Sequence, residues 1–153
     1  NWMTGWTTGC TAAPLPIAKA IIAIQSHSTS NPTSVAKSGA VQALNGPQDH
    51  IAEWLTEFSK RRAFAHEQLN AMPGISCVNA QGAFYLFPNI SSTGMKSAEF
   101  CERLLSEAKV AAVPGAAFGS DDYLRISYVT SMENLNKALE RLGEFVQKIG
   151  SKK

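Results

Sequence analysis

Arg125 is the residue whose type and position most directly suggest chemistry. It stands in the middle of Tyr123-Leu124-Arg125-Ile126-Ser127-Tyr128, an otherwise strand-like run. A guanidinium is costly to bury without an anion, and its planar fork suits two parallel hydrogen bonds to a carboxylate. The alternative is an arginine on the solvent face of an edge strand, paired with Asp121, Asp122 or Glu99. Residue pattern alone favours this second interpretation, because charges in such places are as often structural as functional.

The other titratable side chains give little support for a metal or acid/base site. His27, His50 and His66 lie far apart in sequence and form no His-x-x-x-His or Cys/His cluster, so no metal site is expected. Asp121 and Asp122 are adjacent, and adjacent residues of a strand point to opposite faces. A turn therefore explains the two carboxylates better than a general acid/base pair does.

Composition excludes several classes of partner. The 153 residues carry a net charge of +2, which offers no large field for nucleic acid, and Lys60-Arg61-Arg62 is interpreted as the solvated face of a helix. The apolar run that comes nearest to a membrane span, residues 20–24, is too short to cross a bilayer. Cys10, Cys77 and Cys101 are odd in number and widely spaced, so neither a disulfide framework nor a zinc site is expected. We expect a cytoplasmic protein that interacts with neither membrane nor nucleic acid.

The elements that must position Arg125 follow from hydrophobic spacing and from Gly and Pro punctuation. An apolar stretch from Leu15 predicts a helix buried on most sides. Ser97 is expected to cap a helix, as is Thr130 in a capping box with Glu133. The predicted helices cover residues 15–25, 32–44, 51–72, 97–108 and 131–149, and the predicted strands cover residues 75–78, 83–87, 110–113 and 123–129.

These elements predict an α/β fold whose small domain is of the α+β kind. Helices and short strands alternate after Pro47, whereas the helices before Asn45 have no evident sheet to rest on. We expect residues 1–45 to be the remnant of a larger domain and residues 46–153 to form a small domain. Since the first residue is Asn1 and no secretory signal follows it, the sequence is expected to begin within a longer protein.

Several segments, in order, resemble the class I aminotransferases of pyridoxal-phosphate fold type I, of the aspartate aminotransferase kind. Because each segment alone is weakly specific, their order carries the resemblance, which covers nearly the whole chain. It implies the carboxyl-terminal portion of such an enzyme. The segments are Met3-Thr4-Gly5-Trp6, the run from Gln25 to Ser34, Ala43-Leu44-Asn45-Gly46-Pro47-Gln48-Asp49, Gly82-Ala83-Phe84-Tyr85-Leu86-Phe87-Pro88, Val113-Pro114-Gly115-Ala116-Ala117-Phe118-Gly119 and Leu124-Arg125-Ile126-Ser127-Tyr128.

The resemblance implies roles for named residues. Arg125 matches the family arginine that clamps the α-carboxylate of the amino-acid substrate, which reverses the preference stated above. Phe84 matches a position that approaches the substrate when the small domain closes, although an aromatic residue in a strand is also ordinary core. Ser30 and Asn31 match a loop near the partner subunit's active site, and capping of the next helix is their alternative.

Two departures from the family pattern limit what the chain can do. The lysine that forms the Schiff base with pyridoxal phosphate precedes this segment in the family, and neither Lys19 nor Lys37 occupies its place. Thr7 stands where the family usually has an arginine that holds the cofactor phosphate, and a hydroxyl brings no charge. The chain alone is therefore expected to have no catalytic lysine, to bind no cofactor and to be inactive.

The expected parent enzyme exchanges an amino group between an amino acid, such as aspartate, and a 2-oxo acid. Two alternatives stay open. The parent could be another fold type I enzyme, such as an aminocyclopropane-carboxylate synthase or a β-lyase, or the chain could be a non-catalytic domain kept for oligomer contact or regulation. We also expect a homo-oligomer, because the helix from Leu15 normally needs neighbours.

Overall fold

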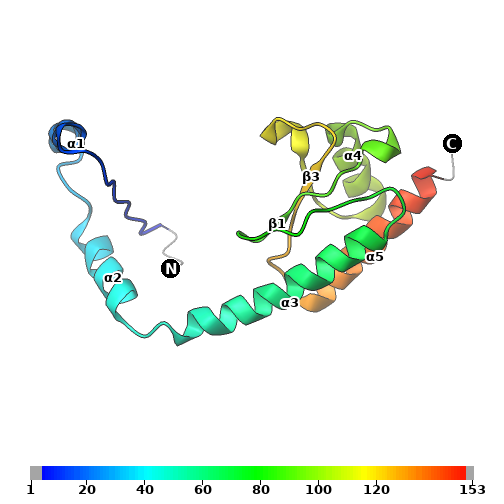
Figure 1. Ribbon diagram of the computed structural model, residues 1–153, viewed down its shortest axis with the longest axis horizontal. Helices are drawn as coiled ribbons and strands as arrows, with labels where there is room; N and C mark the ends of the chain where they lie inside the picture. The colour runs from blue at the N-terminus through cyan, green and yellow to red at the C-terminus, as the bar shows by residue number, and fades with distance from the viewer. Residues whose placement is uncertain (1–4, 151–153) are drawn as a thin grey trace. The chain divides into compact units, whose positions relative to one another are not determined.

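The computed structural model describes residues 5–150, which divide into two compact units (Figure 1). One unit ends at His50 and the other begins at Ile51. Helices and a small antiparallel sheet make up the chain, which confirms the α/β class. That residues 1–45 belong to a larger cofactor-binding domain, with residues 46–153 as the small domain, stays a prediction.

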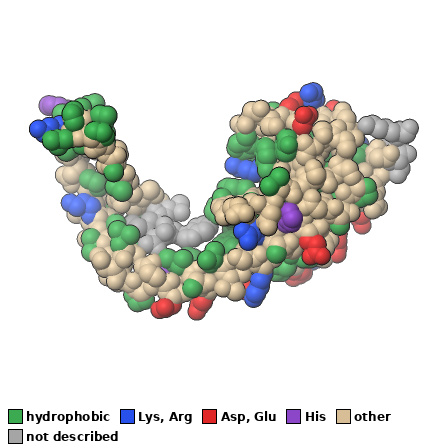
Figure 2. Space-filling view, in the orientation of Figure 1, with side chains coloured by type: hydrophobic (Ala, Val, Ile, Leu, Met, Phe, Trp, Pro, Cys, Tyr) green, Lys and Arg blue, Asp and Glu red, His purple; other side chains and the backbone are tan. Residues whose placement is uncertain are grey.

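The first unit holds helices α1 (Leu15–Ser28) and α2 (Ser34–Asn45). Pro14 precedes α1 and Pro16 lies in its first turn, where the missing amide hydrogen costs nothing. The sequence predicts that α1 is buried on most sides, but within the described chain no residue of α1 is buried. Ile22 and Ile24 are 67% and 70% exposed, and many hydrophobic side chains lie on the visible surface of this helix beside basic and polar ones (Figure 2).

The second unit is built from two long helices and a small sheet with short helical segments between them. Helix α3 begins this unit and α5 ends it. The elements in chain order are α3 (Asp49–Ala71), β1 (Tyr85–Leu86), η1 (Ser91–Thr93), α4 (Ser97–Arg103), the π-helical η2 (Leu104–Ala108), β2 (Val113–Pro114), η3 (Gly115–Phe118), β3 (Leu124–Ser127) and α5 (Met132–Gly150).

The sheet has the order β1-β3-β2, with both pairings antiparallel. Leu86 pairs with Ile126 between β1 and β3, and Val113 pairs with Arg125 between β2 and β3. Because side chains alternate along a strand, Leu86 and Leu124 enter the core, while Tyr85 and Arg125 lie on the opposite face. The strand order places β3 in the centre of the sheet, between β1 and β2.

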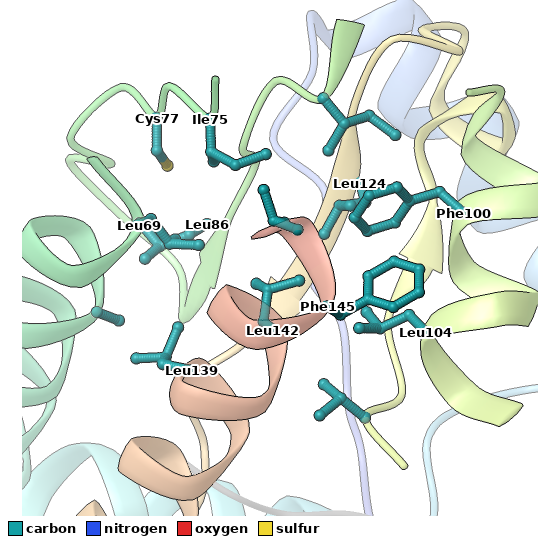
Figure 3. Packing of buried hydrophobic residues seen from close by; sticks show 14 of the residues in the cluster. Leu69, Ile75, Cys77, Leu86, Phe100, Leu104, Leu124, Leu139, Leu142 and Phe145 are labelled. Carbon is teal, nitrogen blue, oxygen red and sulfur yellow. The ribbon is translucent and has the colours of Figure 1, made fainter. Parts of the chain in front are cut away.

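The core of this unit lies between the sheet and the helices α3, α4 and α5 (Figure 3). Phe100 and Phe145 meet edge to face with ring centroids 5.2 Å apart, and Leu104 packs in the same cluster. Leu139 and Leu142 of α5 are 3% and 2% exposed. This packing fixes the inner face of the sheet and leaves its other face for the site.

Several local predictions are wrong. Of the predicted strand over residues 110–113, only Val113 lies in a strand. Residues 75–78 form no strand, since only an isolated bridge joins Ser76 to Asn89. The expected capping box at Thr130 does not form, because the Ser131 hydroxyl accepts the Asn134 amide and Glu133 pairs with Lys137 instead. Ser97 does not cap α4, because its hydroxyl is directed to a carboxylate described below.

The basic run on α3 also differs from its prediction. Lys60 is solvated and pairs with Glu57 at 2.8 Å, but Arg61 and Arg62 are half-buried. The Arg61 guanidinium lies 5.5 Å from the Phe58 ring centroid, and Arg62 donates a hydrogen bond to the Ala80 carbonyl at 2.9 Å. Arg62 therefore ties α3 to the segment that follows it, while Arg61 packs along its own helix.

Candidate functional site

Arg125 projects from the central strand β3 on the face of the sheet away from the core. Its backbone pairs with Val113 of β2, and β1 flanks the strand on the other side. Two neighbouring strands fix the backbone, so the direction of the side chain is set by the pleat rather than by a loop. The alternative of an arginine on an edge strand is wrong.

Two aromatic rings lie against the guanidinium. The central carbon of the Arg125 group is 4.2 Å from the Tyr85 ring centroid and 4.5 Å from the Phe118 ring centroid. Cation–π contacts of this kind favour a cation that has lost part of its water. Tyr85 comes from β1 and Phe118 from η3, so segments on both sides of β3 build the surroundings of one charge.

Further aromatic residues continue this surface beside Arg125. Phe87 stacks on Tyr123 with ring centroids 5.0 Å apart and planes within 5°. Phe118 meets Phe87 edge to face at 6.1 Å. We call Tyr85, Phe87, Phe118 and Tyr123 the aromatic collar of Arg125. Tyr85 and Phe118 lie against the guanidinium, and Phe87 and Tyr123 extend the aromatic surface from Phe118.

No carboxylate neutralises Arg125 within the part of the chain that the structure describes. Asp121 is engaged elsewhere, by Ser97 and Lys96, and neither Asp122 nor Glu99 forms an ion pair with the guanidinium. The buried Nε of Arg125 has no hydrogen-bond partner among the described residues. The Nε atoms of Arg61 and Arg62 share this feature, so what distinguishes Arg125 is a guanidinium without an ion pair that lies against two aromatic rings. The predicted pairing with Asp121, Asp122 or Glu99 is therefore wrong.

Turn η3 brings Phe118 to Arg125, and Gly115 makes this turn possible. A Cβ on Gly115 would lie 2.3 Å from the carbonyl oxygens of both Ser120 and Tyr123. The Gly115 amide donates to the Tyr123 carbonyl at 2.9 Å, and the Ser120 amide donates to the Gly115 carbonyl at 3.0 Å. Only glycine allows this close approach of backbone to backbone.

Ser97 and Asp121 hold the other side of the same turn. The Ser97 hydroxyl donates to Oδ1 of Asp121 at 2.6 Å and accepts the Ala116 amide at 3.2 Å. The hydrogen bonds from Ser97, with a smaller effect from Lys96, hold the pKa of Asp121 below its usual value. Asp121 and Asp122 lie in a turn, as predicted, and Asp121 is ionised at neutral pH.

Phe84 lies one residue before β1 and is half-buried. Its ring packs on Phe58, with centroids 6.4 Å apart, and on Tyr85, with centroids 4.6 Å apart. Tyr128 donates a hydrogen bond to the carbonyl of Ala83, which has a φ of 58°. Phe84 therefore packs both against the core and against the collar ring Tyr85, and its predicted contact with substrate stays a prediction.

The other predicted site residues lie in the first unit. Thr7 is exposed and lines a hollow of about 420 Å³ together with Thr8, Thr11 and Gln25. Ser30 and Asn31 are exposed, and Ser30 has a φ of 63°.

Capping of the next helix does not explain Ser30 and Asn31. Helix α2 begins at Ser34 and Thr33 is its N-cap residue, so neither residue caps it. Their predicted proximity to a partner subunit stays a prediction.

The residues around Thr7 do not by themselves form a site for pyridoxal phosphate. Hydroxyl, amide and aliphatic groups line the hollow, and no lysine or arginine does so within the described chain. A phosphate dianion is bound most strongly where charge-assisted hydrogen bonds are available. No group of three or more His, Cys, Asp or Glu residues that could hold a metal ion occurs among residues 5–150 either.

Sequence reasoning found Arg125 but missed the collar and the Ser97–Asp121 pair. A signal for part of the collar was present, since Tyr85 and Phe87 alternate with Leu86 and Pro88 as on a two-faced strand. Nothing local marks Ser97 and Asp121, which are 24 residues apart in sequence. No helix of residues 5–150 is long and apolar enough to cross a bilayer.

Comparison with known proteins identifies related sequences over most of the chain. The family model described as "Aminotransferase class I and II" matches residues 2–142. An aspartate aminotransferase of Bacillus subtilis is 47% identical over 151 residues, which cover 95% of this chain and 38% of the relative. An aspartate/prephenate aminotransferase of Nitrosomonas europaea is 39% identical over 155 residues. The chain thus spans about 38% of the length of the curated relatives it matches.

Solved structures agree with the sequence relatives. Aspartate aminotransferase from Rhizobium meliloti superposes with a TM-score of 0.88 at 39% identity, covering 95% of this chain and 39% of that one. An aromatic aminotransferase from Pyrococcus horikoshii gives a TM-score of 0.89 at 38% identity, covering 95% and 40% of the two chains. The fold is that of part of a pyridoxal-phosphate-dependent enzyme of fold type I. On this evidence the chain belongs to the class I and II aminotransferase family.

Proposed function

We propose that the chain is the carboxyl-terminal part of an aspartate aminotransferase-type enzyme, in which Arg125 binds the α-carboxylate of the substrates. The observation that carries this proposal is the unneutralised guanidinium of Arg125, held between Tyr85 and Phe118 on a central strand. The substrate classes are an amino acid and a 2-oxo acid. Both carry a carboxylate next to the reacting carbon, so one arginine serves both halves of the reaction.

The geometry suits Arg125 to orient a substrate rather than to react with it. A guanidinium stays protonated, so it cannot move a proton, but its fork fixes a carboxylate in one plane. With the carboxylate fixed, rotation about the neighbouring carbon is restricted, and the Cα–H bond keeps one direction. The collar excludes water from the face of the guanidinium, which strengthens the ion pair.

Pyridoxal phosphate is the proposed cofactor of the complete enzyme, because the resemblance implies it, and it supplies the electron sink for the reaction. The segment described here offers no cation at the Thr7 hollow, so we propose that residues outside it bind the cofactor. This chain alone is then inactive. Incubation with pyridoxal phosphate should give no aldimine absorbance that borohydride reduces and no transamination, and either result would contradict the inactivity.

We further propose a cytoplasmic homo-oligomer. Cys77 and Cys101 are buried free thiols, as suits a reducing compartment. Apolar side chains of α1 such as Leu15 and Ile24 are exposed in this unit, and surfaces of that kind commonly mark contacts between subunits.

One observation favours a second function, a non-catalytic domain retained for oligomer contact. Thr7 stands where the family pattern has an arginine, and the hollow around it lacks a cation. In that case Arg125 has no substrate, and its replacement leaves the behaviour of the assembled protein unchanged.

The test is steady-state kinetics of the complete polypeptide that contains this segment. Arg125→Gln should raise the KM for both aspartate and the 2-oxo acid and lower kcat/KM by about 10- to 150-fold, the usual contribution of hydrogen bonds to a charged group. The control is Arg141→Gln, an exposed arginine of α5 away from the collar, which should keep wild-type kinetics. If both variants behave alike, or if the wild-type protein has no transaminase activity, the proposal fails.

A further inference from the structure

We propose that Ser97 and Asp121 are positioning residues for the Arg125 site, because they hold turn η3 in the place that lets Phe118 lie against the guanidinium. This inference rests on the proposed role of Arg125 as a carboxylate ligand. Ser97 and Asp121 would then support substrate binding without touching the substrate, by holding the turn that carries Phe118.

The connection begins at a fully buried hydroxyl. Ser97 is 0% exposed. Its Oγ donates to Oδ1 of Asp121 at 2.6 Å and accepts the Ala116 amide at 3.2 Å. The Ser97 amide also donates to Oδ1 of Asp121, at 3.0 Å. The hydroxyl therefore uses both its donor and an acceptor position, and its loss would leave a carboxylate and an amide short of partners.

The connection continues through the turn to the ring. The Gly119 amide donates to the Ala116 carbonyl at 3.1 Å, which closes η3 just after Phe118. Gly115 is fastened to Tyr123 on the other side. The segment between these bonds is short, so the backbone at Phe118 follows the position of Ala116.

Phe118 depends on this backbone, because its side chain is not held by the core. It is 48% exposed, and its ring contacts are with Phe87 and Arg125. A half-exposed ring has other rotamers open to it once its backbone moves. Release of Ala116 would therefore let the ring leave the guanidinium, and Arg125 would lose part of the surroundings that keep it in one orientation.

The experiment uses the 153-residue chain with ¹⁵N-labelled arginine side chains, observed by NMR. The ring current of Phe118 displaces the resonance of the Arg125 Nε–H, and Phe118→Leu removes that displacement. Ser97→Ala should move the same resonance toward its position in Phe118→Leu. It should also weaken binding of acetate at Arg125 by about threefold, within the usual range for a cation–π contact.

The matched control is Ser131→Ala, which also removes a hydroxyl that accepts a backbone amide, at the start of α5. It should lower Tm without moving the Arg125 resonance or the acetate affinity, whereas a merely structural Ser97 would behave in the same way as Ser131. The Ser97→Ala/Phe118→Leu double variant should bind acetate no more weakly than Phe118→Leu alone, since both changes act through one ring.

Separate outcomes decide the two claims. A wild-type resonance in Ser97→Ala, or effects on affinity that add fully in the double variant, would overturn the positioning role. Should Ser97→Ala not fold, Asp121→Asn keeps the side-chain volume and should give the same shift in smaller amount. If acetate does not bind the wild-type chain at Arg125, the proposed function fails, and the resonance of the free chain still decides whether Ser97 holds Phe118 in place.

Discussion

Gly115→Ala should destabilise the second unit far more than an ordinary glycine-to-alanine change. The new Cβ would stand 2.3 Å from the carbonyl oxygens of Ser120 and Tyr123, whereas real Cβ atoms almost never approach other atoms within 3.0 Å. Each oxygen would have to move by at least about 0.7 Å, the difference between these two distances. Both are backbone atoms of ordered segments, so neither can turn away as a side chain would.

The size of the effect follows from what must shift. Overpacking of a buried site costs about 1–3 kcal/mol, and the hydrogen bonds that join Gly115 to Tyr123 and Ser120 contribute about 1 kcal/mol each when they are stretched beyond use. Since the strain is relieved in part when a bond breaks, the two costs overlap. We expect a loss of about 2–4 kcal/mol in the free energy of unfolding.

Urea unfolding followed by circular dichroism at 222 nm measures this loss, with Gly82→Ala as the control. A Cβ on Gly82 meets nothing within 4 Å, and Gly82 is exposed. Gly82→Ala should keep the wild-type midpoint or raise it slightly, because alanine restricts the unfolded chain. The Gly115→Ala midpoint should fall by about 1–2 M. Equal midpoints for the two variants would refute the steric argument and the assignment of η3 as a fixed turn.

Three further predictions concern charge, thiols and assembly. Hydrogen bonds from Lys148, and then from Arg103, lower the pKa of Glu107 to about 2, so its contribution to stability is complete above its usual pKa of 4.5 and is lost as the pH falls through about 2. Glu107→Gln should therefore lower Tm at pH 7, and the difference in Tm between this variant and the wild type should shrink between pH 4.5 and pH 2. A constant difference in Tm across that range would contradict the ion pairs of Glu107. Exposed Cys10 should react quickly with an aromatic disulfide reagent, while Cys77 and Cys101 react slowly because burial raises the pKa of both thiols; equal rates for all the thiols would show that the core opens readily. Light scattering should find the chain self-associated through exposed apolar residues such as those of α1, and Ile22→Lys with Ile24→Lys should reduce its mass, whereas a monodisperse wild-type monomer would contradict the proposed oligomer.

The sequence was sufficient to predict the long helices and the place of Arg125. Helices α3 and α5 lie where hydrophobic spacing predicted them. Helix α5 presents a long apolar stripe to the core, whereas α3 buries only Ala65 and Leu69 of its predicted apolar face and leaves Trp54 and Leu55 exposed. The stretch from Ser97 to Ala108 was predicted as a single α-helix, but it changes to a π-helix at Leu104 before Lys109 adopts a left-handed conformation. Leu104 packs against the core at the point where the helix type changes. Hydrophobic periodicity along the sequence does not indicate where an α-helix becomes a π-helix.

The surroundings of Arg125 could not be predicted from local patterns. Whether Arg125 lies on an edge or a central strand depends on where β1 and β2 pair, and those strands are only two residues long. Phe118 reaches the guanidinium only because Gly115 permits a turn that contacts Tyr123. In the first unit, the apolar helix α1 was expected to be buried, but it is exposed among the described residues.

Titration of the ¹⁵N-labelled chain with acetate, compared with acetamide of nearly the same shape, shows whether Arg125 binds a carboxylate. If Arg125 is a carboxylate ligand, acetate should shift its Nε–H resonance with a Kd of about 10 mM or weaker, as suits one charge-assisted contact in half of a site. Acetamide should leave that resonance in place, and Arg125→Gln should abolish the response of its neighbours Tyr85 and Phe118. Equal shifts with acetate and acetamide, or an acetate response at Arg61 and Arg141 as large as at Arg125, would contradict the account.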